Sequence, residues 1–486
     1  MAKLVPVIGL EVHAQLLTKT KIFCSCEVDF GGDPNTRCCP VCTGLPGTLP
    51  VLNKEVVKCG IKAGLALGCE IGRYSKIDRK NYFYPDLPKA YQISQFDAPI
   101  CLAGKVKIDT EDGEKYVRIH HAHIEEDAGK LIHDDIENTS LADYNRCGVP
   151  LLEIVSEPDM SSAEEARAYI EKIAGLLQYA GVSLCRMEEG SLRADVNISL
   201  KREDAEKLGT KVEIKNLNSL KSIVRAIDYE IERQTKLINA GEPIIQETRK
   251  FNDNRGVTSA MRSKENAHDY RYFKEPDVIP VHISEDDIAK IKATMPVLID
   301  ERLDIYMNKY ALTKTDAKIL VADKKISDFY DKSVKCYNNY KQVANLVIAE
   351  LLRYVNEGEL DSSKMPFSPE DFAKLVKMIE EDVVNRNNGK AILKLMVEGA
   401  QDPEVIAKEQ GFLMNNNTDE IVEVVNSVVG EFTSEVEGYL AGKEKLFGFL
   451  MGQCSKRLAG RANPKMIKGT LELTLSKLKD KQSKGM

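Results

Sequence analysis

A carboxylate and an imidazole stand two positions apart near the start of the chain. Residues 5–15 alternate in the manner of a β-strand, so Glu11 and His13 are expected on the same face. Such a pair could bind a divalent cation or move a proton. On its own, the pair is more typical of a strand with one solvent-facing side.

Two later stretches add carboxylates to strand-like sequence. Residues 121–130 contain three consecutive acidic residues, among them Glu126, and the apolar stretch 149–155 contains Glu153. An unpaired carboxylate in an apolar strand would be costly, so Glu153 is expected to have a cation or a hydrogen-bond donor as its partner. We predict a Mg²⁺ site that also holds nucleotide phosphates, built by Glu11, His13, Glu126 and Glu153. Three unrelated ion pairs are the alternative.

Two further segments have the composition of binding surfaces. Residues 78–92 are too rich in aromatic residues and proline for a helix, and they are expected to form a shaped loop of the kind that binds ligands. Residues 191–199 alternate strictly, with Arg193, Asp195 and Asn197 on one face. Without context, an ordinary half-exposed strand is the simpler interpretation of residues 191–199.

Five of the twelve cysteines lie within residues 24–42. The spacing of two pairs, Cys24 with Cys26 and Cys39 with Cys42, is typical of four thiolates around a tetrahedral zinc ion. Cys38 is a possible substitute for Cys39. Because sulfur would fill all four positions, we predict a structural zinc that is closed to substrate, with unligated thiols as the alternative.

Motifs of the usual nucleotide and hydrolase folds do not occur in the sequence. The chain contains no Gly-x-x-x-x-Gly-Lys-Ser/Thr phosphate loop, no His-Glu-x-x-His and no Gly-x-Ser-x-Gly. It also lacks the glycine- and serine-rich run of an amidase nucleophile, so we do not expect it to hydrolyse glutamine by itself.

The elements that must position these groups fall into three regions. Up to about residue 290, strand-like alternation is mixed with helices, one of which begins at a capping box, residues 162–165, and ends at Gly181. Beyond Pro280 amphipathic helices dominate, with starts at Ser368 and Thr418. We predict an α+β protein with a mixed-sheet catalytic domain over residues 1–292, a helical domain over 293–405 and a helical tail over 406–486.

Composition and charge exclude several classes of protein. The 486 residues, 43% hydrophobic and 29% charged, are too many for a minimal module and too apolar for a disordered chain. No apolar run approaches the ~20 residues of a membrane helix, and no export signal precedes the first strand, so a soluble cytoplasmic protein is expected. The net charge is −7, but residues 441–486 alone carry +8. That tail could bind a phosphate backbone or could simply be solvated.

Taken together, these segments resemble the family of B subunits of the aspartyl/glutamyl-tRNA amidotransferases over essentially the whole chain. The resemblance is carried by long stretches in the family's order: 7–13, 24–47, 78–95, 123–130, 151–159, 190–199, 213–220, 246–249 and 269–277. Its tail also has a Gly-Gln pair and an Ala-Asn-Pro triplet within residues 448–464.

The resemblance implies a cradle-like catalytic domain that uses ATP and Mg²⁺ to phosphorylate the misacylated carboxylate of Asp-tRNA(Asn) or Glu-tRNA(Gln). Ammonia from a glutaminase A subunit would then displace the phosphate, and a small C subunit would brace the pair. It implies the Mg²⁺-binding and catalytic role for Glu11, His13, Glu126 and Glu153. It suggests nucleotide or aminoacyl-end contacts for Tyr82, Tyr84, Asp86, Lys89, Arg193, Asp195 and Asn197, and tRNA contacts for Lys456, Arg457, Arg461 and Lys465.

Two questions stay open at this point. Some members of the family lack the cysteines, so zinc is expected to brace a loop rather than to take part in the reaction. A non-catalytic, zinc-braced adaptor that binds tRNA is the alternative function. The choice between Asp-tRNA(Asn) and Glu-tRNA(Gln) depends on the synthetases of the source organism, which the sequence does not contain.

Overall fold

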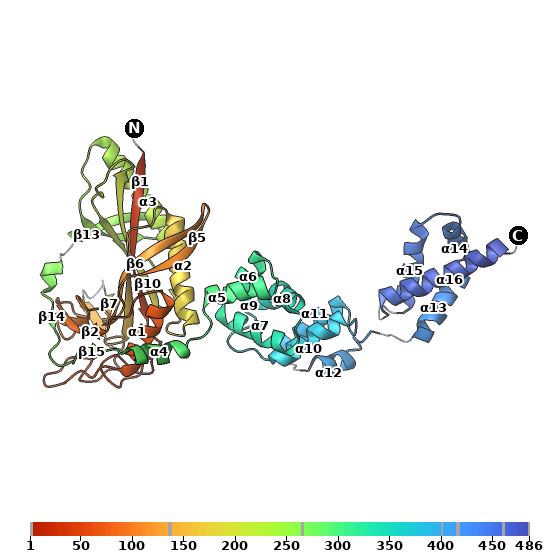
Figure 1. The fold of residues 1–486 in the computed structure, drawn as a ribbon, viewed down its shortest axis with the longest axis horizontal. Helices are drawn as coiled ribbons and strands as arrows, with labels where there is room; N and C mark the ends of the chain where they lie inside the picture. The colour runs from red at the N-terminus through yellow and green to blue at the C-terminus, as the bar shows by residue number, and fades with distance from the viewer. Residues whose placement is uncertain are drawn as a thin grey trace. The chain divides into compact units, whose positions relative to one another are not determined.

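The computed structural model describes residues 3–134, 139–263, 267–399, 402–414, 418–458 and 462–484. The chain divides into two compact units after Glu301. Strands and helices build the first unit and helices build the second, as the ribbon shows (Figure 1). The predicted α+β class is therefore confirmed.

A mixed sheet is the centre of the first unit. Within the described residues, it has eight strands in the order β13 (Val257–Ser263), β12 (Glu247–Asn252), β11 (Val212–Lys215), β10 (Leu192–Arg202), β1 (Leu4–Gln15), β9 (Pro150–Ser156), β6 (Gly113–Glu126) and β5 (Gly104–Thr110). Neighbouring strands are antiparallel except β11 and β12, which are parallel.

Smaller elements surround this sheet. The short strands are β2 (Tyr74–Ser75), β3 (Asp78–Asn81), β4 (Tyr91–Ser94), β7 (Lys130–Asp134), β8 (Thr139–Asp143), β14 (Phe273–Lys274) and β15 (Val281–His282). The helices are α1 (Lys54–Ala66), α2 (Ala163–Tyr179), α3 (Leu220–Ala240) and α4 (Glu285–Ala293). Strand β3 lies between β14 and β4, so the loop that follows β3 is held beside residues near 273.

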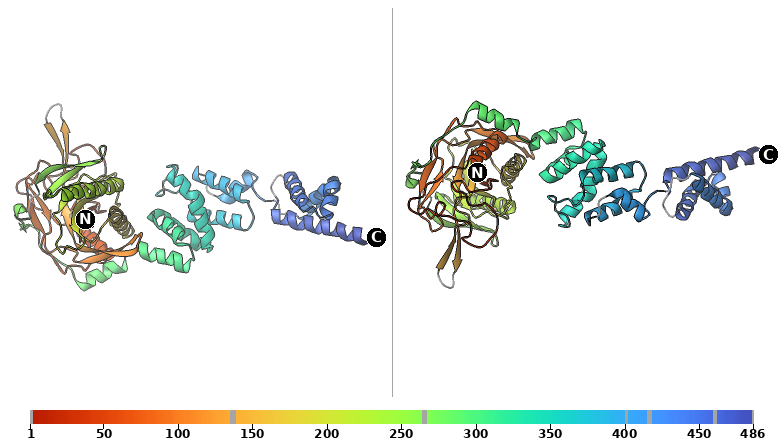
Figure 2. Two further views of the ribbon diagram at one scale, coloured as in Figure 1. Left: turned by 90° about the horizontal axis from the view of Figure 1, so that it is seen from above. Right: turned by 90° about the horizontal axis from the view of Figure 1, so that it is seen from below.

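One face of the large sheet is apolar because each strand alternates. In β1, Ile8, Leu10 and Val12 are fully buried, while the residues between them face the other way. Helices α2 and α3 pack on each other and against the sheet, as two views show (Figures 1 and 2). The hydrophobic core lies between these helices and the sheet, which leaves the opposite face free to hold polar groups.

The second unit consists of helices. They are α5 (Ile299–Asp304), which begins just before the division, α6 (Lys314–Val321), α7 (Lys324–Cys336), α8 (Tyr340–Leu346), α9 (Leu352–Asn356), α10 (Pro369–Glu380), α11 (Arg386–Val397), α12 (Pro403–Glu409), α13 (Thr418–Glu431), α14 (Thr433–Leu440), α15 (Lys445–Arg457) and α16 (Pro464–Lys484). Helices α13 to α16 share one apolar core, with Ile421, Leu450 and Leu471 fully buried.

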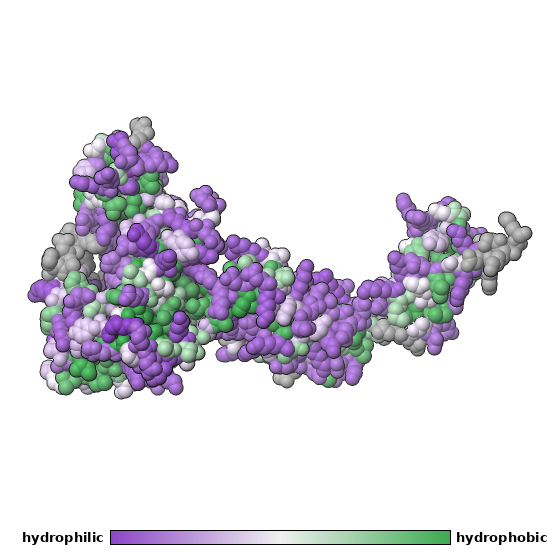
Figure 3. Space-filling view, in the orientation of Figure 1, coloured by the Kyte–Doolittle hydropathy of each residue, from purple (hydrophilic) through white to green (hydrophobic). Residues whose placement is uncertain are grey.

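No helix among the described residues is long and apolar enough to cross a membrane. The surface over α7, α10 and α12 is mainly hydrophilic on the side in view (Figure 3). The structure divides the chain once, after Glu301. The domain boundaries predicted at residues 292 and 405 therefore stay predictions.

Candidate active site

Strand pairing brings one row of polar side chains together on the polar face of the sheet, opposite helices α2 and α3. His13 of β1 lies opposite Glu153 of β9 on one side and opposite Arg193 of β10 on the other. His123 of β6 is the next residue in the row, opposite Glu153. Paired residues on adjacent strands project to the same face, so residues more than a hundred positions apart become neighbours.

The first group of possible metal ligands, which we call the histidine cluster, consists of His13, Glu125 and Glu153. Their ligand atoms lie within 4.8 Å of one another. His13 Nε2 is 3.4 Å from Glu153 Oε2 and 3.7 Å from Glu125 Oε1. On the other side, His123 Nε2 is 3.4 Å from Glu153 Oε2. Two carboxylates are therefore held between two imidazoles.

The two imidazoles of this face keep the Glu153 carboxylate ionised. Burial raises the pKa of Glu153, but His123 and His13 outweigh it and hold that pKa well below its ordinary value. Burial lowers the pKa of His123, but the neighbouring carboxylates raise it to about 10. An ionised Glu153 with the Glu125 carboxyl group beside it offers oxygen ligands of the kind that divalent cations prefer.

A second group, which we call the acidic cluster, consists of Glu11, Asp195 and Glu213. Their oxygen atoms also lie within 4.8 Å of one another. Asn197 Nδ2 donates to Glu11 Oε1 at 2.8 Å. Lys215 forms ion pairs with Asp195 and, at 3.2 Å, with Glu213. Three carboxylates would repel one another, so this cluster needs cations, of which Lys215 is one.

The structure does not bring the four predicted Mg²⁺ ligands into one group. Glu11 lies in the acidic cluster, and Glu126 lies in neither cluster. Successive residues of β6 project to opposite faces, so Glu125 joins His13 while Glu126 turns away. Glu126 is 2% exposed, binds Lys89 Nζ at 2.8 Å and accepts a hydrogen bond from the Ile93 amide at 2.8 Å.

The residues predicted to contact the nucleotide or the aminoacyl end lie in different places relative to the two clusters. Arg193 donates to Asp127 at 2.8 Å beside the row of polar residues, while Asp195 and Asn197 belong to or contact the acidic cluster. Tyr82 lies near Lys80, whose ammonium is 5.9 Å from the centre of its ring. Lys80 is also 4.8 Å from the ring of Tyr270.

The remaining loop residues lie farther along. Tyr84 is half exposed, and the backbone carbonyl of Asp86 accepts from the Gly129 amide at 2.8 Å. Lys89 pairs with Glu126, as described above. The side chains of Tyr84, Asp86 and Lys89 are therefore not members of the histidine cluster or the acidic cluster.

Four residues of this site were not individually predicted as ligands or contacts. They are Lys80, His123, Glu125 and Glu213. One signal was available, since His123 and Glu125 alternate on β6 as Glu11 and His13 do on β1. The strand pairing that joins Glu213 to this face was not visible in the sequence.

The four predicted zinc ligands do come together. The sulfur atoms of Cys24, Cys26, Cys39 and Cys42 lie within 4.8 Å of one another, and those of Cys39 and Cys42 are 3.9 Å apart. Tetrahedral zinc with bonds of about 2.3 Å requires sulfur atoms about 3.8 Å apart, so the four side chains fit this ion. A hydrogen bond with Cys24 lowers the pKa of the Cys42 thiol to about 4, against the opposing effect of burial.

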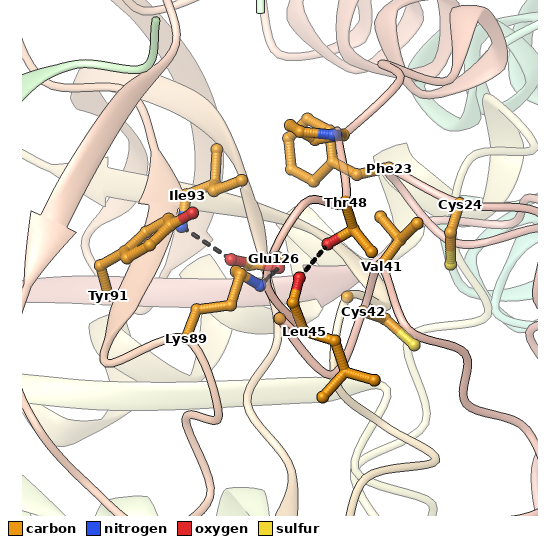
Figure 4. A pocket seen from close by; sticks show the side chains of 13 residues that line it. Phe23, Cys24, Val41, Cys42, Leu45, Thr48, Lys89, Tyr91, Ile93 and Glu126 are labelled. Carbon is orange, nitrogen blue, oxygen red and sulfur yellow. Dashed lines mark hydrogen bonds and ion pairs between the residues drawn. The ribbon is translucent and has the colours of Figure 1, made fainter. Parts of the chain in front are cut away.

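A cavity of about 110 Å³ lies between the cysteine segment and Glu126. Lys89 and Glu126 lie on one side of it, and Val41, Cys42 and Cys24 on the other (Figure 4). Packing around the cavity is close, since a Cβ atom at Gly44 would come within 2.4 Å of Lys89 Cγ. The cysteine segment therefore helps to hold the Lys89 side chain in place.

The candidate tRNA-binding residues differ in exposure and in the ion pairs that they already make. Lys456 is exposed on α15, and Lys465 is 85% exposed, with its ammonium 3.2 Å from Asp382. Arg457 is occupied within the tail, since it donates to Ser427 and pairs with Glu431. Arg461 lies outside the described residues.

Comparisons with known proteins agree over nearly all of the chain. A family model described as the GatB/GatE catalytic domain matches residues 6–289, and one described as the GatB domain matches residues 328–475. The chain is 52% identical to the B subunit of the aspartyl/glutamyl-tRNA(Asn/Gln) amidotransferase of Ruminiclostridium cellulolyticum, covering 98% of this chain and 99% of the relative. It is 48% identical to the protein of the same name from Thermoanaerobacter pseudethanolicus, covering 97% of this chain and 99% of the relative.

Proposed function

Because the chain belongs to the family of aspartyl/glutamyl-tRNA(Asn/Gln) amidotransferase B subunits and has that family's tRNA-dependent amidotransferase function, we propose that the polar face of its sheet is where the aminoacyl carboxylate is activated. In the proposed reaction a carboxylate oxygen of the misacylated residue attacks the γ-phosphorus of ATP, and ADP leaves. Ammonia then attacks the acyl carbon, inorganic phosphate leaves, and the nitrogen gives up a proton.

One observation supports this assignment above the others. The histidine cluster and the acidic cluster lie on neighbouring strands of the same polar face, and each offers ligand atoms within 4.8 Å of one another. Phosphoryl transfer needs positive charge around the transferring group, and Mg²⁺ bound by such ligands supplies it. We assign His13, Glu125 and Glu153 to one cation, and Glu11, Asp195 and Glu213 to a second.

Basic side chains surround these carboxylates and are suited to hold phosphate oxygens. Lys215 pairs with the acidic cluster, and Arg193 donates to Asp127. The ammonium of Lys80 lies near the rings of Tyr82 and Tyr270. We propose that they orient the triphosphate and the aminoacyl end, with Tyr82 and Tyr84 from the loop that follows β3. The roles of Asp86 and Lys89 are proposed only as support of that loop.

The proposed partners are those that membership of the family implies. We propose that ammonia comes from a glutaminase A subunit, with a small C subunit in the same complex. The second substrate is a misacylated tRNA, held through the basic tail, and the place of action is the cytoplasm. We also keep the division into domains 1–292, 293–405 and 406–486 as a proposal.

The test uses the reconstituted complex with misacylated tRNA, glutamine and ATP. We expect Glu153→Gln and Glu11→Gln each to lower tRNA-dependent ATP cleavage and amide formation by about 10²-fold, the scale of losing one group that stabilises transition-state charge. Glu111→Gln, an exposed carboxylate in the turn between β5 and β6, is the control and should keep full activity. Full activity in both site variants would reject the site, whereas wild-type tRNA binding without any tRNA-stimulated ATP cleavage would favour the adaptor.

A further inference from the structure

Zinc bound by the four cysteines would leave an unbalanced negative charge, part of it on Cys42, whose side chain is buried. Four thiolates around a dication carry excess negative charge, and burying it is costly without a nearby positive group. Hydrogen bonds to coordinating sulfur reduce this cost, and groups of this outer kind affect metal affinity strongly. The question is therefore which cation lies beside the cysteine segment.

Lys21 is the cation whose ammonium contacts a cysteine sulfur within the described part of the chain. Its side chain is fully buried, at 0% exposure, which is rare for lysine. Its ammonium donates to Cys42 Sγ at 3.6 Å and to the backbone carbonyl of Tyr144 at 3.3 Å. No carboxylate among the described residues lies within ion-pair distance of this ammonium, so the sulfur is its anionic partner.

The backbone places Lys21 firmly at this position. Its amide donates to the carbonyl of Cys26 at 2.9 Å, and the amide of the next residue, Ile22, donates to the carbonyl of Gly148 at 2.9 Å. The space around the side chain is small, since a Cβ atom at Gly148 would lie 3.7 Å from Lys21 Cδ. Lys21 therefore lies between the cysteine segment and residues 144–148, which lead into β9 and its Glu153.

We propose that Lys21 is the counterion of the zinc site, a positioning residue that stabilises the zinc-bound thiolates and ties them to the segment leading into β9. This inference rests on the zinc assignment but not on the ATP-dependent reaction. The competing explanation is a lysine that only satisfies the Tyr144 carbonyl. The two differ in whether removing the charge changes the affinity for zinc.

The experiment measures zinc affinity by competition with a chromophoric chelator on the full chain, together with metal content. We expect Lys21→Met to weaken zinc binding by about 10- to 100-fold, the range found when outer partners of metal ligands are removed. Lys19→Met is the matched control, because Lys19 is exposed two residues away, and it should bind zinc as the wild type does. Equal affinities of Lys21→Met and wild type would overturn the proposal.

A second variant separates charge from hydrogen bonding and also covers poor folding of Lys21→Met. Lys21→Gln keeps an N–H donor for Tyr144 but is neutral, so it should lose affinity as Lys21→Met does. Its cobalt-substituted form should also show a shifted thiolate-to-metal charge-transfer band. Wild-type affinity in Lys21→Gln would overturn the counterion role, and a wild-type protein without zinc would overturn both this role and the zinc site.

Discussion

At the scale of single residues, the neighbours Glu125 and Glu126 have opposite surroundings. Glu125 belongs to the histidine cluster, while Glu126 binds Lys89 beneath the cysteine segment. We expect Glu125→Gln to raise the Mg²⁺ concentration needed for half-maximal tRNA-dependent ATP cleavage and to lower the maximal rate by about 10²-fold. The Mg²⁺ dependence of the reconstituted complex measures this directly.

Glu126→Gln is the matched control for that experiment. It should leave the half-maximal Mg²⁺ concentration unchanged, because the Glu126 side chain does not face the cluster. It should instead destabilise the protein, by up to about 3–5 kcal/mol, because Lys89 loses the anion of a buried pair. If the two variants exchanged these behaviours, the proposed histidine cluster would be wrong.

Residue types on the polar face were predictable, and their grouping was not. Strand alternation alone placed Glu11 and His13 on one face. The apolar residues around Glu153 indicated that its carboxylate needs a partner, because burying it unpaired would cost free energy. The structure places Glu125, and not Glu126, beside His13, because the facing of these side chains depends on the phase of β6 relative to β1 across the intervening strand β9. Glu213 joins the acidic cluster only through the pairing of β10 with β11, which no local pattern specifies.

At the scale of elements, local signals predicted the helix starts well. Helix α10 begins after Ser368, at the predicted start, and α2 begins after Ser162, where a capping box was predicted. In α2 the capping differs in one detail, since the Glu165 side chain accepts from the Ser161 amide and from Lys115. Caps depend on four consecutive residues, so the sequence contains nearly all the information they need.

Helix α2 covers the apolar face of the sheet, so its start offers a test of the fold. The Ser162 hydroxyl accepts from the Glu165 amide at 3.1 Å. Ser162→Ala should cost about 1 kcal/mol, which is about fivefold in the equilibrium for opening the first turn. Hydrogen–deuterium exchange should become faster by that factor in the first turn of α2, while α3 should exchange at the wild-type rate. Unchanged exchange at α2 would show that Ser162 does not stabilise its start.

At the scale of the whole molecule, charge is separated along the chain, and the basic tail has its own core. Helices α15 and α16 supply Leu450, Cys454 and Leu471 to the core they share with α13. Deleting residues 441–486 would therefore unfold α13 and α14 as well as remove charge. Substitution of exposed lysines tests the role of the charge without that loss.

We expect the double variant Lys456→Gln and Lys468→Gln to bind tRNA more weakly than the wild type. Both side chains are exposed, Lys456 on α15 and Lys468 on α16. If each contacts a phosphate, the slope of log affinity against log salt should become shallower by somewhat less than one for each lysine removed. Lys394→Gln with Lys390→Gln on α11 removes the same charge elsewhere in the second unit and should leave that slope closer to the wild-type value. Equal slopes in the tail variant and the wild type would mean that these two lysines do not meet the phosphate backbone, and the tRNA would have to be held by another surface.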